Sequence, residues 1–374
     1  MITDPLGLYI HVPFCVRKCK YCDFCSLPIA DKSVPDEYID RLKDEIEAYS
    51  EYGKMPLSTI YIGGGTPSIL SAEQLEKICS AIKYHFNFDK NIEFTLEANP
   101  GTVTREKLLG YRECGVNRIS FGLQSIHDTE LSALGRIHTF DDFLDSYNIA
   151  RECGFDNINI DLMYGIPHQT IASFSKTLEK IISLFPEHIS VYGLIVEEGT
   201  PFYDLKDKLP LPNEGCECDM YYLACGLLKE AGYSHYEISN YARCGYESRH
   251  NLKYWRAENY IGIGTSAASY FCGKRYVNSR SVREYLGQTG LNYHTVEEVD
   301  RNCQMFEYAM MRLRLSEGFS LEDYKARFGT DFTLGKRSIL NKLCERGLIK
   351  IDGGRLFLTE RGFYVSNAIL TEIL

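Results

Sequence analysis

The sequence predicts an α/β protein whose first half is a parallel sheet covered by helices. Strand-like and helix-like segments alternate from residue 8 to about residue 198, and glycine follows several of the helical patterns. The 374-residue chain, with 44% hydrophobic and 25% charged residues, has globular composition and the length for more than one core. Successive βα units form a parallel sheet, because a crossover helix lets neighbouring strands run in the same direction.

Six strands and five helices are expected in this half. The strands are Leu8–Phe14, Thr59–Gly63, Ile92–Ala98, Arg118–Leu123, Ile158–Met163 and Ile189–Val196. The helices are Asp36–Glu51, Ala72–His85, Arg105–Cys114, Phe140–Cys153 and Ile171–Leu184. Ser71 with Gln74 is placed to cap the start of a helix, and Gly53, Gly115 and Gly154 are placed to end helices.

Charge and cysteine content restrict the function. A net charge of −10 argues against a nucleic-acid partner, because phosphate binding needs a basic surface. Fourteen cysteines would suggest disulfides in a small secreted chain, but this chain is long and its first 14 residues lack a basic signal-peptide region. Its apolar runs are shorter than a membrane span. We therefore expect a cytoplasmic protein with reduced thiols and no integral membrane segment.

The first expected strand runs directly into three cysteines, Cys15, Cys19 and Cys22. Thiolates are soft ligands suited to iron–sulfur clusters, and three of them would leave one iron of a four-iron cluster open to a cosubstrate. A structural zinc site, the alternative, would use four closed ligands. Cys25 lies close by, but no second CxxC or HxxxH pair accompanies it.

This Cx3Cx2C pattern after a strand resembles the signature of the radical S-adenosylmethionine (SAM) superfamily. The flanking residues, from Tyr9-Ile-His-Val-Pro-Phe-Cys15 to Cys22-Asp-Phe24, are similar to the oxygen-independent coproporphyrinogen III oxidase-like group and, within it, to the HemW branch of heme chaperones. The oxidases of this group carry a fourth cysteine where Phe24 stands here, and a longer segment before the cluster. The resemblance implies a partial, TIM-like (β/α)6 barrel with a [4Fe–4S] cluster on Cys15, Cys19 and Cys22.

Motifs at the expected strand ends fit the same family, and barrels of this kind hold active residues at the carboxyl ends of their strands. The resemblance implies SAM binding by Tyr9, Tyr21, Gly63, Gly64, Gly65, Thr66, Glu97, Gln124, Arg136 and Asp161. Consecutive glycines permit close backbone approach, although alone they indicate only a tight turn. Arg136 could bind a carboxylate bidentately. Glu97 and Asp161 suit hydroxyl or ammonium groups. No residue is assigned to catalysis.

A turn-rich stretch from Glu198 to Gly215 marks the expected end of the barrel, which we place at residues 1–210. An α+β accessory region follows at 211–298, with a helix at Asp219–Gly232 and a strand at Ser234–Ser239. Its His250-Asn-Leu-Lys-Tyr-Trp255 segment matches an HNxxYW pattern typical of the HemW branch. His250 could be an axial heme ligand, or it could support the domain junction structurally.

Two further segments complete the chain. Ile261-Gly-Ile-Gly264 superficially fits a dinucleotide fingerprint but lacks the βαβ unit and the following acid, so we interpret it as a glycine-rich strand turn closing the cofactor site. Residues 299–374 are expected to form a small winged-helix-like domain. Its elements are helices Gln304–Leu315, Leu321–Phe328 and Ser338–Arg346 and a hairpin at Ile349–Leu358. The acidic surroundings favour a packing or partner domain over a DNA reader.

The resemblance implies a heme chaperone that binds heme, a [4Fe–4S] cluster and SAM, and that transfers heme to an acceptor protein. The acceptor could be membrane-associated, and a flavodoxin-type reductant is the expected electron donor. Heme would be held by His250 or by a thiolate. Two alternatives stay open: a coproporphyrinogen III oxidase of porphyrin biosynthesis, which decarboxylates propionates, and a radical SAM enzyme acting on another substrate.

Overall fold

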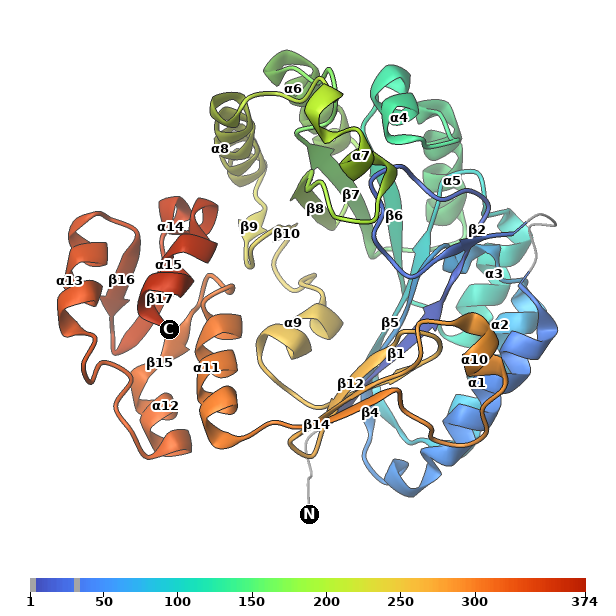
Figure 1. The fold of residues 1–374 in the computed structure, drawn as a ribbon. Coiled ribbons are helices and arrows are strands. Elements are labelled where there is room, and N and C mark those ends of the chain that lie inside the picture. The colour runs from blue at the N-terminus through green and yellow to red at the C-terminus, as the bar shows by residue number, and fades with distance from the viewer. Residues whose placement is uncertain (1–4, 30–33) are drawn as a thin grey trace.

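The computed structural model, which describes residues 5–29 and 34–374, is built around a sheet of twelve strands. Its middle is parallel and contains the six predicted strands in chain order. Their bounds are Leu6–Val12 (β1), Leu57–Gly64 (β4), Phe88–Ala98 (β5), Arg118–Gln124 (β6), Ile158–Tyr164 (β7) and His188–Gly193 (β8). The sheet curves into the partial barrel of Figure 1, which confirms the predicted fold class.

Helices cover the outer face of this barrel (Figure 1). They are Asp36–Ala48 (α1), Ala72–His85 (α2), Arg105–Cys114 (α3), Asp128–Leu134 (α4), Phe140–Glu152 (α5) and Ile171–Ile182 (α6). Two of them have the predicted bounds because their ends are capped. Ser71 and Gln74 form a capping box on α2, and Gly115 ends α3 in the left-handed conformation. The short α4 was not among the predicted elements.

Side chains along the barrel strands alternate between the two faces of the sheet. On β6, Ile119 and Phe121 are fully buried in the hydrophobic core, whereas Arg118 and Ser120 line an inner cavity. The same alternation places Asn159 and Asp161 of β7, and His188 and Ser190 of β8, inside the barrel. The outer face therefore contributes the apolar contacts that hold sheet and helices together, and the interior is polar.

Both edges of the parallel sheet are extended by residues after the barrel. At the β8 edge, Asn240–Ala242 (β10) and Ser234–His235 (β9) add antiparallel strands, so the predicted strand at Ser234–Ser239 ends early. At the β1 edge, Tyr260–Ile263 (β11) pairs parallel to β1. Antiparallel strands follow at Ala268–Phe271 (β12), Lys274–Val277 (β13) and Thr295–Glu298 (β14).

The glycine-rich segment at Ile261–Gly264 is thus the end of a strand packed against β1. A Cβ atom on Gly264 would lie 2.6 Å from the carbonyl oxygen of His11, and the φ of Gly264 is +100°, so only glycine fits there without strain.

The remaining elements of this part connect these strands. They are Phe14–Cys15 (β2), Leu27–Pro28 (β3), Ser50–Tyr52 (η1), Pro67–Ile69 (η2), Pro201–Asp204 (α7), Lys206–Lys208 (η3), Glu214–Glu230 (α8), Arg249–Trp255 (α9) and Val282–Leu286 (α10). The helix predicted at Asp219–Gly232 is α8, which begins earlier because Asn213 caps it. None of the described helices is long and apolar enough to cross a membrane.

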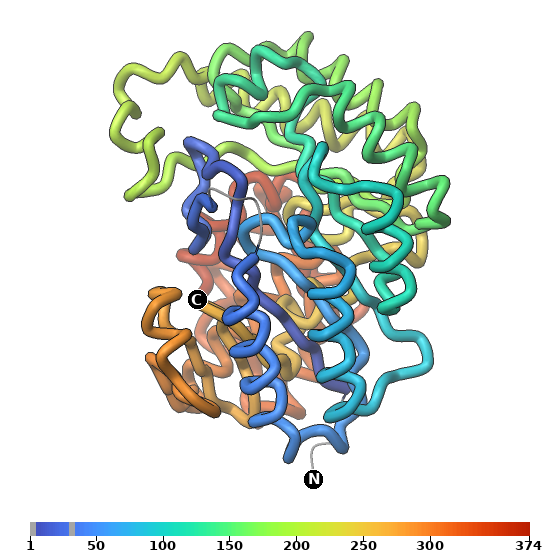
Figure 2. Tube along the Cα trace, turned by 90° about the vertical axis from the view of Figure 1, so that its right-hand side faces the viewer, coloured from blue at the N-terminus to red at the C-terminus, as the bar shows by residue number. Residues whose placement is uncertain are grey.

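The last part of the chain has the order of a winged helix and lies on the far side of the barrel from α1 and α2 (Figures 1 and 2). Its elements are Arg301–Arg312 (α11), Phe319–Ser320 (β15), Leu321–Phe328 (α12), Arg337–Glu345 (α13), Ile349–Asp352 (β16), Arg355–Leu358 (β17), Glu360–Tyr364 (α14) and Ser366–Ile373 (α15). An aromatic cluster that includes Tyr308, Phe319 and Tyr324 fills its interior.

Candidate cofactor site

Three cysteine thiols line one cavity at the carboxyl ends of the barrel strands. Cys15 ends β2, and Cys19 and Cys22 follow in the loop to β3. All three border a cavity of about 130 Å³. Backbone hydrogen bonds hold the loop in place, from Leu27 N to Pro13 O at 2.7 Å and from Lys20 N to Leu134 O at 3.0 Å. The structure therefore brings the three predicted cluster ligands together.

The buried thiols of this loop are suited to a metal-bound state. Burial raises the pKa of the Cys15 thiol, and it raises the pKa of Cys22 to about 11. Such a thiol ionises when a metal stabilises the thiolate. Within the described residues, no three His, Cys, Asp or Glu side chains converge on a point where a single metal ion could bind. A four-iron cluster has no such requirement, because its thiolates bind different irons.

Cys25 faces away from this cavity. Its Sγ donates a hydrogen bond to the carbonyl oxygen of Arg280 at 3.3 Å, and its own carbonyl oxygen lies 2.8 Å from Nε2 of His11. Phe24, by contrast, is 59% exposed and borders the cavity. The loop thus presents three thiols and an aromatic ring to the cavity.

The glycines after β4 allow the cysteine loop to pack closely on the barrel. A Cβ atom on Gly64, whose φ is +114°, would lie 2.6 Å from Cε1 of His11, and one on Gly65 would lie 2.6 Å from the carbonyl oxygen of Phe14. Gly64, Gly65 and Thr66 border the cavity, and the Thr66 hydroxyl lies 3.4 Å from Cys15 Sγ. These glycines are therefore required by the protein's own packing.

Two predicted carboxyl groups border the same cavity. Glu97, at the end of β5, accepts hydrogen bonds from the Tyr61 hydroxyl at 2.8 Å and from Gly64 N at 3.0 Å. Asp161 accepts from Asn159 Nδ2 at 2.8 Å and from the Ser120 hydroxyl at 3.3 Å. Burial raises the pKa of Glu97 to about 7 and raises that of Asp161 as well. A cationic ligand would favour the ionised form of both groups.

Arg136 connects the cysteine loop to the strand ends. Its Nη2 donates to Asn99 Oδ1 at 2.7 Å and to the carbonyl oxygen of Gly122, and its Nη1 lies 3.6 Å from Cys19 Sγ. Its Nε is buried without a partner among the described residues. Gln124 borders the same cavity with a φ of +75°, at a register shift where β6 ends. Such strain in a residue other than glycine is typical of binding sites.

The two predicted tyrosines occupy different positions. Tyr21 borders the cavity. Tyr9 and Gly63 are not among the residues that border it. The Tyr9 hydroxyl lies 2.9 Å from Nδ1 of His11. Because Nε2 of His11 donates to Cys25 O, Nδ1 must accept from Tyr9, which fixes the ring tautomer. Tyr9 therefore acts on the cysteine loop through His11, and its direct contact with SAM stays a prediction.

His250 lies at the opposite, amino end of the barrel. Its Nδ1 is 2.9 Å from the Thr59 hydroxyl, its Nε2 is 2.8 Å from the Tyr254 hydroxyl, and its ring stacks on Tyr61 with centroids 5.2 Å apart. Burial lowers its pKa to about 3. Both ring nitrogens are therefore occupied. This geometry favours the structural alternative over heme ligation by His250.

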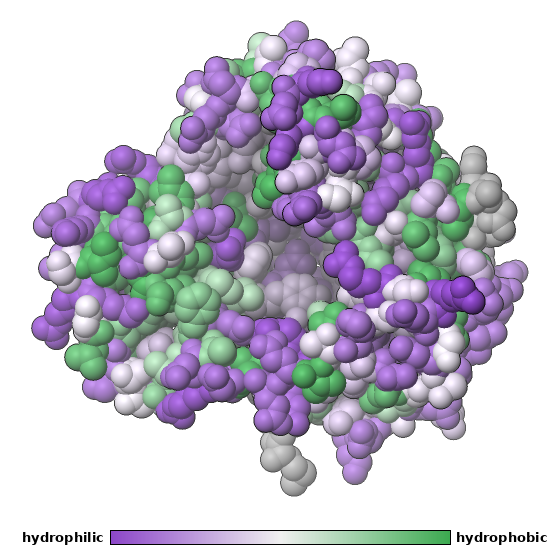
Figure 3. All heavy atoms as spheres, in the orientation of Figure 1, coloured by the Kyte–Doolittle hydropathy of each residue, from purple (hydrophilic) through white to green (hydrophobic). Residues whose placement is uncertain are grey.

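The sequence motifs assigned no ligand role to a second set of inward residues. A deeper cavity of about 230 Å³ shares Tyr21, Glu97 and Asp161 with the first and is also bordered by Arg118, Asn159, His188, Ser190, Tyr192 and Asn251. The molecule is visibly hollowed over the barrel strands (Figure 3). One sequence signal could have identified these residues. Strands of a helix-covered parallel sheet are usually apolar on both faces, so polar residues at alternate positions along them indicate a polar interior.

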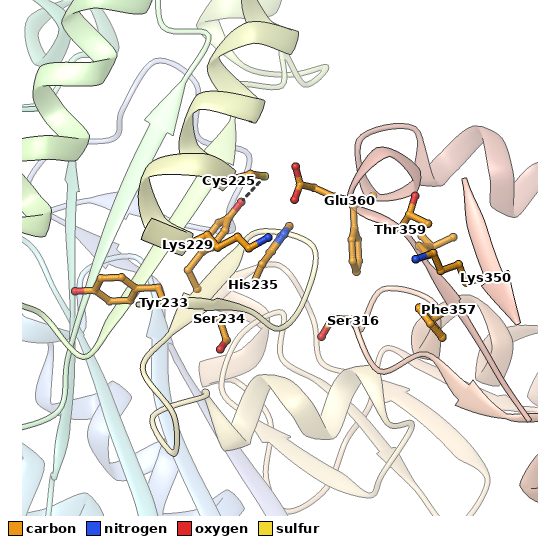
Figure 4. Close-up of a pocket in the computed structure, with 13 residues that line it drawn as sticks. Cys225, Lys229, Tyr233, Ser234, His235, Ser316, Lys350, Phe357, Thr359 and Glu360 are labelled. Atoms are coloured by element: carbon orange, nitrogen blue, oxygen red, sulfur yellow. Dashed lines mark hydrogen bonds between the residues drawn. The ribbon is translucent and has the colours of Figure 1, made fainter. Parts of the chain in front are cut away.

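A third and larger cavity, of about 510 Å³, lies between α8, β9 and the C-terminal winged-helix-like region (Figure 4). Lys229 and His235 approach it from one side, and Lys350, Phe357 and Glu360 from the other. We call it the interdomain cleft. Neither the predicted cluster cysteines nor the strand-end residues border it.

Comparison with known families supports the cofactor chemistry. Residues 9–181 match the model of the radical SAM superfamily, and residues 299–365 match the HemN C-terminal domain. A solved structure, coproporphyrinogen III oxidase (HemN) from Escherichia coli, superposes with a TM-score of 0.87 over 99% of this chain and 90% of that chain at 23% identity. This likeness concerns the fold.

Curated relatives are similar over almost the whole chain. The heme chaperone HemW of Bacillus subtilis (strain 168) is 39% identical over 373 residues, covering 98% of each chain. The heme chaperone HemW of Lactococcus lactis subsp. lactis (strain IL1403) is 37% identical over 377 residues, covering 100% of this chain and 98% of the relative.

Proposed function

Because the chain belongs to the radical SAM superfamily and, within it, to the HemW family, we propose that it is a heme chaperone that binds heme and transfers it to an acceptor protein. Similarity over the full length of relatives that are named heme chaperones is the observation that carries this proposal. The oxidase alternative has weaker support, because the coproporphyrinogen III oxidase structure is only 23% identical in sequence to this chain.

The superfamily implies a [4Fe–4S] cluster and SAM. The proposal assigns the cluster to Cys15, Cys19 and Cys22, whose thiols share a cavity. SAM would be held beside it by Gly64, Gly65, Thr66, Glu97, Gln124, Arg136 and Asp161. When bound, these groups together supply one-electron chemistry, and the protein's residues bind, orient and shield them. Tyr21 would close the side of the site nearest the loop.

The loop chemistry supports the chaperone over the oxidase. Phe24 occupies the position at which the oxidase pattern has a fourth cysteine, and the Cys25 thiol donates to Arg280 O instead of facing the cavity. Among the described residues that border the cavity, there is thus no fourth thiol.

The remaining partners follow from the same proposal. The acceptor is a heme protein, which could be membrane-associated, and a flavodoxin-type donor would reduce the cluster. The site of action is the cytoplasm. Because both ring nitrogens of His250 are hydrogen-bonded, heme ligation by this residue would require it to give up its bond to Thr59 or to Tyr254.

The test uses anaerobically reconstituted protein in two parallel assays. In the first, hemin is titrated and the Soret band is followed. In the second, SAM, a reductant and coproporphyrinogen III are supplied and the porphyrin products are separated. We expect a saturable Soret change and no appreciable protoporphyrinogen formation. Robust protoporphyrinogen formation, or a Soret band that does not saturate, would overturn the chaperone proposal.

A further inference from the structure

The deeper barrel cavity, of about 230 Å³, contains a network of polar residues that hydrogen-bond one another. Asn159 is the centre of this network. Its Nδ2 donates to Ser120 Oγ at 2.7 Å and to Asp161 Oδ1 at 2.8 Å. Its Oδ1 accepts from His188 Nδ1 at 2.5 Å and from Ser190 Oγ at 3.1 Å. Polar groups that are paired in this way have little capacity left for a ligand.

Arg118 lies outside this network. Its side chain is 2% exposed and borders the cavity, yet none of its nitrogens forms a hydrogen bond, and it forms no ion pair, with any described residue. Its Nε is fully buried without a partner. The neighbouring carboxyl groups, Glu97 and Asp161, are directed to donors of their own. A buried guanidinium without an acceptor is costly, which favours an anionic ligand that supplies one.

Two further donors face the same space. Asn251, from the HNxxYW segment on α9, and Tyr192, on β8, both border the cavity. Neither side-chain head group has a hydrogen bond of standard geometry to a described residue, and Ser190 approaches the Tyr192 hydroxyl. Arg118, Asn251 and Tyr192 come from three different elements. Such convergent, unpaired polar groups in a concave site are typical of ligand recognition.

The mouth of the cavity is aromatic and exposed. Phe24 is 59% exposed and Tyr192 is 39% exposed, and both border the cavity. About 230 Å³ is below the usual range of sites that enclose a drug-sized ligand, roughly 300–1,000 Å³. The cavity is therefore suited to a polar arm of a larger ligand, whose flat apolar body would lie against the rings at the mouth.

We propose that Arg118 anchors a carboxylate subsite inside the barrel, which takes a propionate arm of a tetrapyrrole whose ring packs on Phe24 and Tyr192. This inference rests on the proposed heme-binding function and specifies where the carboxylate of that ligand binds. Asn251 and the Tyr192 hydroxyl complete the subsite as neutral donors. The interdomain cleft of Figure 4 is the competing location, because Lys229 and Lys350 could also pair with propionates there.

The test compares hemin with hemin dimethyl ester, in which both propionates are blocked. Each is titrated by its Soret change into the wild-type protein, Arg118→Met, Arg118→Lys and Tyr192→Phe. We expect the wild type to prefer hemin by about tenfold or more, as for a charge-assisted hydrogen bond. Arg118→Met should bind hemin only as well as the ester, with ester affinity unchanged, and Arg118→Lys should restore part of the preference.

Several outcomes separate this inference from the proposed function. If the wild type binds hemin and the ester equally, or if Arg118→Met keeps the preference, the subsite is wrong and heme binding stands. If a double variant with Lys229→Gln and Lys350→Gln lost the preference for hemin, the propionates would bind in the interdomain cleft instead. No saturable hemin binding at all would overturn the proposed function and the subsite together. Should Arg118→Met fail to fold, Tyr192→Phe decides, because it removes one hydroxyl and should reduce the preference severalfold.

Discussion

The two ends of the same barrel differ in how their polar side chains are paired. At the carboxyl end, three thiols face a cavity and Arg136 keeps a buried Nε without a partner in the described structure. At the amino end, the Glu93 carboxylate accepts hydrogen bonds from the backbone amides of Arg249 and His250, both at 2.9 Å, and His250 uses both of its ring nitrogens. The first arrangement has capacity for ligands, and the second fixes α9 to the barrel. Ionisable and metal-binding residue types occur at both ends. The two ends differ in whether the polar atoms of these side chains already have hydrogen-bond partners, and this difference distinguishes a binding site from a structural contact.

The cysteine loop should give the largest effect at the carboxyl end. We expect Cys15→Ala, Cys19→Ala and Cys22→Ala each to abolish the cluster, because each removes one of only three ligands. Cys25→Ala should retain it, because the Cys25 thiol is directed to Arg280 O. Iron and sulfide content with the visible absorbance of the reconstituted proteins would measure this. Full cluster loss in Cys25→Ala would contradict the assignment.

At the amino end, substitutions should affect stability first. His250→Ala would leave the Thr59 and Tyr254 hydroxyls without their partner and would create a cavity under Tyr61. We expect a loss of about 2–4 kcal/mol in the free energy of unfolding, seen as a lower thermal midpoint. His294→Ala, at an exposed histidine, is the matched control and should shift the midpoint little.

The opposite result would remove the contrast between the two ends. If His250→Ala kept its thermal midpoint and lost the hemin Soret band, His250 would be a heme ligand after all.

Local patterns explain how much of this contrast the sequence could predict. Helices α2 and α3 were predicted to the residue because amphipathic spacing and their caps are properties of neighbouring residues. The three cysteines were predicted together because they lie within eight residues. The placement of α9 depends on Glu93, which is 157 residues away from His250. The pattern of residues within the HNxxYW segment contains no information about a partner so distant in the sequence. The parallel pairing of β11 with β1 is non-local in the same way.

The unpaired Arg118 shows the same limitation. Its place in the expected strand at Arg118–Leu123 was predicted, but its lack of a partner depends on side chains from β5, β7 and β8. Pairing is a property of the assembled interior. A binding group and a structural group of the same residue type therefore cannot be separated from one sequence.

Arg136 tests whether the carboxyl end binds SAM. Arg136→Ala should weaken SAM binding by about tenfold or more, because it removes a guanidinium placed beside Cys19 and Asn99. Calorimetric titration of cluster-loaded protein measures this, with Arg112→Ala, at an exposed arginine on α3, as the control. Iron content should be checked in parallel, since Arg136 also contacts the cysteine loop. Unchanged affinity at full cluster loading would count against the site.

The smallest expected effect is a pH dependence of SAM affinity that arises from Glu97. Burial raises the pKa of this carboxyl to about 7, so near pH 5.5 it is mostly protonated in the free protein. A cationic ligand favours the carboxylate, and binding must then release a proton. SAM affinity should therefore rise by about tenfold between pH 5.5 and pH 7 and level off above the pKa, by linkage.

The stability of the free protein should change in the opposite sense. The folded state binds the extra proton between the ordinary pKa of glutamate and 7, so the contribution of Glu97 to stability falls as the pH rises through that window.

Glu97→Gln provides the control for this last prediction. The amide keeps the size of the side chain and does not titrate. Its single oxygen can accept from only one of the two donors, the Tyr61 hydroxyl or Gly64 N, because these bind different oxygens of Glu97. SAM affinity in this variant should be weaker at pH 7 than in the wild type, and nearly the same at pH 5.5. Titrations in buffers of different ionisation enthalpy would show directly whether the wild type releases a proton on binding and Glu97→Gln does not. A wild-type affinity that stays flat across this range would show that Glu97 is not the group that meets the ligand's positive charge. The carboxyl end would then resemble the amino end, where carboxylates serve the fold.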